Sequence, residues 1–435
     1  MRRPFLRTLV LFPSLALVAC NALVNRESPI QVSDDGGAVD GSDVPDGTVS
    51  GRGDAASDAA EADARVVDAG TPADAHADAA VPDATLGDAG EGGTIRDSGP
   101  DGLVEADAGP VCPDGGCPIL TVAGTFVFPA DVEVDDTHVY WFVYGGQNQG
   151  LDGFVYRLPK DRTCIGRDAG CLDLLAYERF RITQSTIAPN DVCWTESYEY
   201  DREVVCFSKN QGTLRRIARG QSYAFAPTYD DGVVYWVLRG TVDAGPAAIV
   251  GASLAAGIDA GTRTVVSGRR HVSEFVAQGA EVVWSEGNEG EDGGLFAVGK
   301  DGGALRQLAS ASNGPRYTNV HGGFVYWSPS GENAIYRAPL SGAGPSTRIV
   351  TTSSFVFDLR VDDVGIVWAE MGTPPNNLDS AVRAANLDGS DVRTLAYDQP
   401  SIAAMTADAT HAYFVVNGTR TANYEDGELR RAVRF

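Results

Sequence analysis

Cysteines have the most reactive side chains of this chain, and six of the seven lie between residues 112 and 206. Their spacing favours three local pairs: Cys112 with Cys117, Cys164 with Cys171, and Cys193 with Cys206. An even number of cysteines at short spacings is typical of disulfides in exported proteins. A zinc site is the alternative, but the Cys-x2-Cys spacing that zinc sites commonly use is missing. We therefore predict disulfides, with a connectivity that rests on proximity alone.

Histidines and acidic residues give no persuasive catalytic or metal site. The chain has five histidines and lacks the His-Glu-x-x-His, Gly-x-Ser-x-Gly and phosphate-loop patterns. His138 and His411 each stand three residues before a repeated aromatic residue, with no third metal ligand beside them. The loop 286–292 is acidic enough to suggest calcium, but it lacks EF-hand spacing, and a solvated loop is favoured. We expect no catalytic residues, metal or cofactor, with calcium as the one alternative.

The seventh cysteine, Cys20, ends an N-terminal segment that reads as an export signal. Three arginines precede an apolar stretch at 9–19 that is too short to span a bilayer. The sequence LVAC at 17–20 resembles the lipobox of bacterial lipoproteins, which implies that Cys20 carries the lipid and that residues 1–19 are removed. An ordinary signal-peptide cleavage site is the alternative. Asn21 differs from the aspartate of an inner-membrane retention signal, so the outer membrane of a Gram-negative cell is favoured.

Residues 20–110 differ in composition from the rest of the chain. Positions 21–110 hold twenty Asp or Glu, four Arg and no Lys, and they contain no Phe, Trp or Tyr. Such a segment cannot bury enough apolar surface to offset its ordering entropy, and like charges extend it. We predict a lipid-anchored, disordered Asp/Ala/Gly-rich linker with a reach of about 50 Å. The net charge of the whole chain is −25, which argues against a nucleic-acid partner.

From residue 111 onward, an aromatic residue that follows a short apolar run recurs at intervals of 41 to 53 residues. The seven anchors are Trp141, Trp194, Trp236, Trp284, Trp327, Trp368 and Phe414. A period of this length, with several short strands in each unit, is typical of the blades of a β-propeller. We therefore predict an all-β fold, a seven-bladed β-propeller over residues 111–435.

Each repeat reads as four strands. An alternating strand such as 130–134 comes first, an Asp- or Gly-bearing turn follows, and the aromatic strand and two more strands complete the unit. The seventh repeat ends after its third strand, at 428–433, whereas a strand-like segment at 119–123 precedes the first repeat. We expect this N-terminal strand to complete the last blade and close the ring, which hides exposed strand edges.

The fifth repeat carries a family resemblance. It reads VYWS at 325–328, IYRAPLSG at 335–342 and RIV at 348–350. This pattern resembles the YWTD propellers of lipoprotein receptors and their bacterial relatives, including the DUF5050 and TolB-like propellers. The family's aspartate two places after the tryptophan is absent, and glutamates stand there in three blades: Glu196, Glu286 and Glu370. The chain also has one blade more than a YWTD propeller, so the resemblance implies the fold and not the receptors' function.

One face of the predicted propeller carries the long loops. If the first strand of each blade is innermost, the loops between second and third strands share a face with the blade-to-blade crossings; we call it the long-loop face. The loops are 142–153, 195–203, 237–247, 285–294, 369–380 and 415–427. The crossings also carry Phe180 and Tyr223, and their predicted ligand-binding residues are Arg179, Arg181, Arg269, Arg270, His271, Arg316, Tyr317, Phe355 and Tyr397.

Arginine binds carboxylates bidentately, and aromatic rings stack on sugars or side chains. The alternative is that these arginines pair with the acidic loops around them. We expect a monomeric, envelope-tethered binding or scaffold module for a protein, peptide or glycan, touching the membrane through its lipid alone. Two alternatives stay open, namely a lyase or hydrolase with a site at the mouth of the central channel, and a structural subunit of an envelope assembly. An enzyme is the less favoured reading.

Overall fold

A computed structural model describes residues 119–145, 152–165, 171–198, 201–221, 223–239, 246–256, 261–287, 293–311, 313–419 and 426–434. All of them belong to the second of two compact units, Ser98–Phe435. The signal peptide, Cys20, the linker and the Cys112–Cys117 pair lie outside the described residues. Within these ranges, no helix has the length and apolar character needed to cross a membrane.

The described residues form seven four-stranded antiparallel sheets, one 3-10 turn (Leu254–Ala256) and no α-helix. Blades 1 to 4 are built from β2 (Pro129–Val134), β3 (His138–Val143), β4 (Gly153–Pro159) and β5 (Asp173–Arg179); β6 (Ile182–Ile187), β7 (Asp191–Tyr198), β8 (Asp201–Ser208) and β9 (Thr213–Ala218); β10 (Ala224–Asp230), β11 (Val233–Leu238), β12 (Ala247–Ser253) and β13 (Arg263–Arg269); β14 (Val272–Gln278), β15 (Glu281–Glu286), β16 (Gly293–Gly299) and β17 (Arg306–Ala311).

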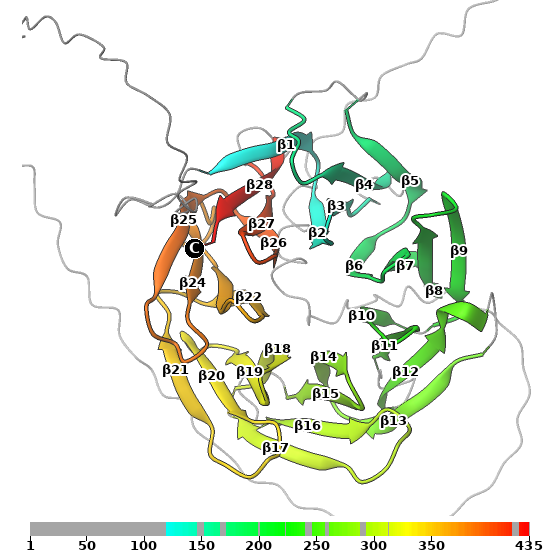
Figure 1. Cartoon of the computed structure of the whole chain (residues 1–435), viewed down its shortest axis with the longest axis vertical. Coiled ribbons are helices and arrows are strands. Elements are labelled where there is room, and N and C mark those ends of the chain that lie inside the picture. Colours follow the sequence, from blue (N-terminus) through cyan, green and yellow to red (C-terminus); the bar gives the residue numbers. More distant parts are fainter. Residues whose placement is uncertain are drawn as a thin grey trace, which may run out of the picture. The chain divides into compact units, whose positions relative to one another are not determined.

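Blades 5 to 7 follow the same order. They are built from β18 (Pro315–His321), β19 (Phe324–Pro329), β20 (Ala334–Pro339) and β21 (Thr347–Thr351); β22 (Val356–Val361), β23 (Ile366–Glu370), β24 (Ser380–Ala385) and β25 (Arg393–Gln399); β26 (Ile402–Ala407), β27 (His411–Val416) and β28 (Gly427–Val433), with β1 (Leu120–Phe126) beside β28. Figure 1 shows the seven sheets arranged as the blades of a ring. The predicted seven-bladed propeller is confirmed.

The first strand of each blade lies closest to the axis of the ring (Figure 1). These inner strands contact one another around it, as β2 contacts both β6 and β26, and β18 contacts both β14 and β22. The strand order on which the long-loop face depends is therefore confirmed. The aromatic anchors lie in the second strands and are at most 1% exposed. They pack between neighbouring blades, and Trp194 of blade 2, for example, shares an apolar cluster with Phe142 of blade 1.

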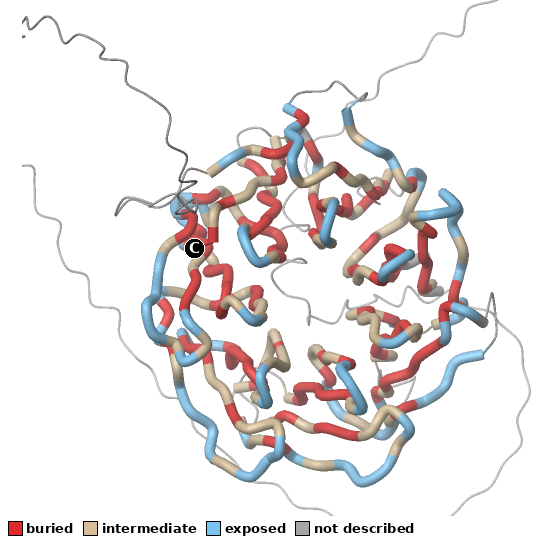
Figure 2. Tube along the Cα trace, viewed as in Figure 1, coloured by how far each residue is buried: buried red, intermediate tan, exposed pale blue. Residues whose placement is uncertain are grey.

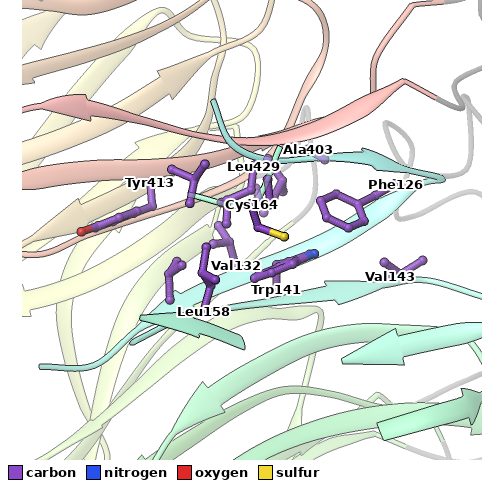
Figure 3. Close-up of a cluster of buried hydrophobic side chains, with 14 residues drawn as sticks. Phe126, Val132, Trp141, Val143, Leu158, Cys164, Ala403, Tyr413 and Leu429 are labelled. Atoms are coloured by element: carbon purple, nitrogen blue, oxygen red, sulfur yellow. The ribbon is translucent and has the colours of Figure 1, made fainter. Parts of the chain in front are cut away.

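The ring is closed by the N-terminal strand, as predicted. β1 pairs antiparallel with β28, from Leu120 opposite Arg431 to Phe126 opposite Gly427. Figure 3 shows the apolar cluster at this seam, in which Phe126 lies near Trp141 of blade 1 and Leu429 of blade 7. The strand is longer than the expected 119–123, because the chain continues to pair past two register shifts.

Two of the three predicted disulfides are present. Cys193 and Cys206 lie opposite each other on β7 and β8 and are bonded. Cys164 and Cys171 are bonded in the loop between β4 and β5. The backbone N–H of Cys164 donates to the carbonyl of Val122 at 2.7 Å, so this disulfide loop also contacts the closing strand.

Charged side chains link neighbouring blades on the face opposite the long loops. At four junctions, a cation that directly follows the third strand of one blade pairs with an aspartate that ends or directly follows the first strand of the preceding blade. The pairs are Lys160–Asp408, Lys209–Asp135, Lys300–Asp230 and Arg434–Asp362. At the junction of blades 2 and 3, the same two positions hold Leu254 and Ala188, which share an apolar cluster. At these five junctions, the cation and the aspartate are either both present or both replaced by apolar residues. This is expected because a buried charge without a partner is costly.

The seam yields a stability prediction. Val122, at 1% exposed, faces the cluster at the seam, whereas Leu120 on the same strand is 38% exposed. Val122→Asp buries an unpaired carboxylate, which costs several kcal/mol, and we expect calorimetry to show a melting temperature lower by about 10 °C. Leu120→Asp places the same charge in solvent and should change it by less than about 2 °C. Equal shifts in the two variants would show that β1 does not close the ring.

Candidate functional site

The backbone at the rim of the long-loop face is unusual. The residue directly before the inner strand has a left-handed conformation in six blades, at φ between 47° and 52°: Phe128, Arg181, Tyr223, His271, Gly314 and Ser401. At five of these the carbonyl accepts a hydrogen bond from the residue just after the second strand, as Tyr223 does from the N–H of Arg239 at 3.3 Å. Bulky side chains rarely adopt this conformation, at a cost of about 1–3 kcal/mol. The frame thus holds five side chains at the rim, four of them large.

Two of the predicted ligand-binding arginines are bound within the protein. Arg179 donates to Glu196 of the next blade at 2.9 Å, and Arg269 donates to Glu286 of the next blade at 2.9 Å. Both glutamates also accept from the indole N–H of the tryptophan two places earlier, at 3.3 Å for Glu196 and 2.6 Å for Glu286. These glutamates stand where the YWTD pattern has its aspartate. They anchor the crossing from the preceding blade, as the alternative interpretation of these arginines expected.

The structure does not gather the other predicted residues into one cluster. Arg270 and His271 are exposed in the crossing before β14, and Phe355 is half-buried before β22. Arg316 and Tyr317 are half-buried on the inner strand β18. Tyr397 is 52% exposed on β25, the outermost strand of its blade. Arg181 is the one member of the set that joins a larger group of basic and aromatic side chains.

That group spans blades 1 to 3, and we name it the arginine cluster: Arg181, Arg202, Arg239, Tyr144 and Tyr223. The guanidinium of Arg202, at the start of β8, lies 5.4 Å from the ring centre of Tyr223 and donates to the carbonyl of Ala224 at 3.0 Å. The N–H of Arg239 donates to the carbonyl of Tyr223. Strand register places Arg181 and Arg202 at the same end of blade 2, since Ile182 lies opposite Glu196 and Ser197 opposite Arg202.

The arginine cluster concentrates positive charge on a chain of net charge −25. Burial, and then the positive charges of Arg239 and Arg181, lower the pKa of Arg202, against the opposing effect of Tyr144 and Tyr223. Tyr223 is 42% exposed, so the cluster opens to solvent. Guanidinium groups held close together beside aromatic rings are suited to binding an anionic group.

A second charged group lies on the inner strands. Asp131 of blade 1 accepts from the N–H and hydroxyl of Ser185 in blade 2, at 2.7 and 2.9 Å. At the equivalent position of blade 6, Asp358 accepts from the N–H of Met405 in blade 7 at 3.0 Å and from Arg360 at 2.8 Å. These aspartates tie neighbouring inner strands together.

Arg360 is the positively charged member of this group, which we name the axial group: Asp131, Glu133, Glu274, Asp358 and Arg360. It interacts electrostatically with Asp358, Glu133, Asp131 and Glu274, which come from blades 6, 1 and 4. Burial raises the pKa of Glu133 to about 8, with Arg360 lowering it and the two aspartates raising it. Burial likewise raises the pKa of Asp131 above its usual range. Shifted carboxyl groups are common at functional sites, but structural networks produce them too.

Neither histidine site nor calcium site gains support from the described part of the chain. It contains no group of three or more His, Cys, Asp or Glu side chains that could hold a metal ion. His138 and His411 each share a hydrogen bond with the preceding threonine at 2.8 Å. Most of the acidic loop 286–292 lies outside the described residues, although Glu286 itself is bound to Arg269.

The axial group yields a pH prediction. The pKa of Glu133 lies above the 4.5 of an ordinary glutamate, so between that value and about 8 the folded state binds a proton that the unfolded state does not. Its contribution to stability therefore falls as pH rises through this window. Glu133→Gln removes this effect, and we expect its melting temperature relative to the parent to rise by a few degrees between pH 5 and 9.

The matched control for this prediction is Glu178→Gln, at an exposed glutamate on the outer strand β5. Its difference from the parent should stay constant over the same pH range. A constant difference for Glu133→Gln as well would contradict the assignment.

No protein-family model matches the chain, and no curated protein matches it in sequence. Solved structures do resemble it. A virginiamycin B lyase from Staphylococcus aureus has a TM-score of 0.51 at 10% identity, over 72% of this chain and 98% of that one. A puromycin-hydrolysing peptidase from Mycobacterium tuberculosis has a TM-score of 0.50 at 14% identity, over 70% of this chain and about half, 53%, of that one. A chain of a nidogen/laminin complex gives 0.45 at 15% identity, over 61% and 94%. The likeness to the lyase and the peptidase shows the β-propeller fold alone, and activity does not transfer with it.

Proposed function

We propose that this protein is a non-enzymatic binding or scaffold module, held at the cell envelope by a lipid on Cys20. In this proposal the acidic linker separates the propeller from the membrane, and the long-loop face binds a protein, peptide or glycan. A rigid frame with variable loops over one face is a common arrangement for binding proteins.

The observation that carries the proposal is the rim of the long-loop face. Four residues with large side chains have a left-handed backbone conformation that such residues rarely adopt: Phe128, Arg181, Tyr223 and His271. Tyr223 and His271 are exposed, and neither lies within an apolar core cluster. Strain of this kind persists where the surrounding structure enforces it, often at ligand sites. Figure 2 shows that buried residues concentrate within the blades, while the outer strands carry much of the exposed surface.

A capture experiment tests the working face. The full chain, in detergent, would be mixed with envelope extract, and bound proteins and glycans quantified by mass spectrometry. We expect a stoichiometric partner that Tyr223→Asn/Arg270→Glu loses by about tenfold or more, because both residues are exposed on the long-loop face.

The matched control is Arg162→Glu, an exposed arginine in the loop between β4 and β5 on the opposite face. It should capture as much partner as the parent. Capture that is equal in all three proteins, or absent from all, would contradict a binding role for the long-loop face.

The anchor has its own test. Cys20→Ala removes the thiol that would carry the lipid, so fractionation of cells should move most of the protein from the membrane pellet to the soluble fraction. Several acyl chains give near-irreversible attachment, whereas a polar chain without them has no comparable membrane affinity. Membrane association that persists in this variant would rule out the lipid as the anchor.

A further inference from the structure

We propose that the arginine cluster binds a short acidic peptide segment, with Arg181 and Arg202 contacting its carboxylates and Tyr223 packing beside them. This inference rests on the proposed binding role of the long-loop face and names the ligand class for one part of that face.

The first argument is the lack of carboxylate partners. Among the described residues, no Asp or Glu lies within ion-pair distance of Arg181 or Arg202; Arg181 packs over Phe180 at 5.1 Å and Arg202 over Tyr223. The two glutamates of blade 2 that the structure describes are bound elsewhere, since Glu196 pairs with Arg179 and Glu203 with Arg216 at 2.6 Å. A guanidinium has five donors in a planar fork that matches a carboxylate. The two arginines therefore retain donors for a ligand.

The second argument is proximity. The like charges of Arg181 and Arg202 repel each other, and Arg202 is half-buried where water screens its charge less. An anion that bridges them relieves this repulsion and replaces hydrogen bonds to water with charge-assisted ones. Each of the two guanidinium groups can hold a carboxylate of its own through charge-assisted hydrogen bonds, so a ligand with two or more neighbouring carboxylates fits the cluster best.

The third argument is the length of the ligand. Residues 111–435 carry a net charge of −12 by count. Charges in solvent act over a Debye length of about 8 Å at physiological salt. A short acidic segment stays within that distance of the cluster, whereas a long polyanion would extend over the rest of a domain whose net charge is negative. The geometry therefore favours a few adjacent Asp or Glu side chains of a protein partner over a nucleic acid or a polymeric acidic glycan.

The test uses the full chain in detergent and fluorescein-labelled tetraglutamate as the probe, followed by anisotropy at low and at raised NaCl. We expect saturable binding that weakens with salt and is absent with labelled tetraglutamine. Arg181→Met and Arg202→Met should each weaken binding by about tenfold or more, the loss of a charge-assisted contact. Arg162→Met, on the opposite face, should bind like the parent.

Arg181 provides the safer variant, because its guanidinium donates no hydrogen bond to any described residue, whereas Arg202 supports Ala224. Near-ultraviolet circular dichroism of each variant would check that it is folded. Tetraglutamate binding that is absent, or unchanged in both variants, would overturn the proposal. Tighter binding of labelled tetragalacturonate would also overturn it, since the ligand would then be an acidic glycan.

The two proposals fail separately. If envelope capture depends on the long-loop face while tetraglutamate binding does not depend on Arg181 and Arg202, the binding role stands and the acidic-peptide ligand falls. If capture is independent of the face and tetraglutamate still binds through Arg181 and Arg202, the cluster is an anion site without the envelope role.

Discussion

The pairing of β1 with β28 is the contact on which the rest of the propeller depends. A blade buries both of its faces only when it has a neighbour on each side, so the first and last blades need a closed ring. Phe126 of β1 shares one apolar cluster with Trp141 and Leu429, which joins blades 1 and 7. Closure also fixes the inner strands around the axis, and residues such as Glu133 and Asp358 interact only because it does.

Much of this architecture could be predicted from a single sequence, because a repeat of tryptophans at blade spacing is visible without any structure. The missing last strand at the C-terminal end and the extra strand before the first blade indicated closure. The residues that form the ion pairs between blades also follow a pattern in the sequence. Lys209 and Asp135 form the pair at the junction of blades 1 and 2, and the equivalent positions at the next junction hold Leu254 and Ala188. That pattern becomes meaningful only once it is known which turns face each other.

The candidate site was harder to predict from the sequence, because it depends on a difference between two nearby arginines. Arg179 and Arg181 lie in one crossing, yet Arg179 is bound to Glu196 whereas Arg181 has no carboxylate partner among the described residues. The left-handed conformation at Arg181 turns the chain between them, and no local sequence pattern marks it. Arg202 and Arg239 escaped notice because they stand in or beside long loops of mixed composition. Asp131 and Glu133 read as the exposed positions of an alternating strand.

The bound arginines help to explain how the arginine cluster is held in place. The contacts of Arg179 with Glu196 and of Arg269 with Glu286 each tie a crossing to the next blade, and Arg179 lies two residues before Arg181. The guanidinium groups therefore sit on a backbone that cannot easily relax to separate their charges, and the energy of their repulsion is available to an incoming anion. The excess negative charge of the domain acts in the opposite sense on every longer polyanion. Selectivity for a short ligand would then depend on two lengths. Within the span of the cluster an anion is attracted by the arginines, and a segment that extends beyond about a Debye length is repelled by the net negative charge of the domain.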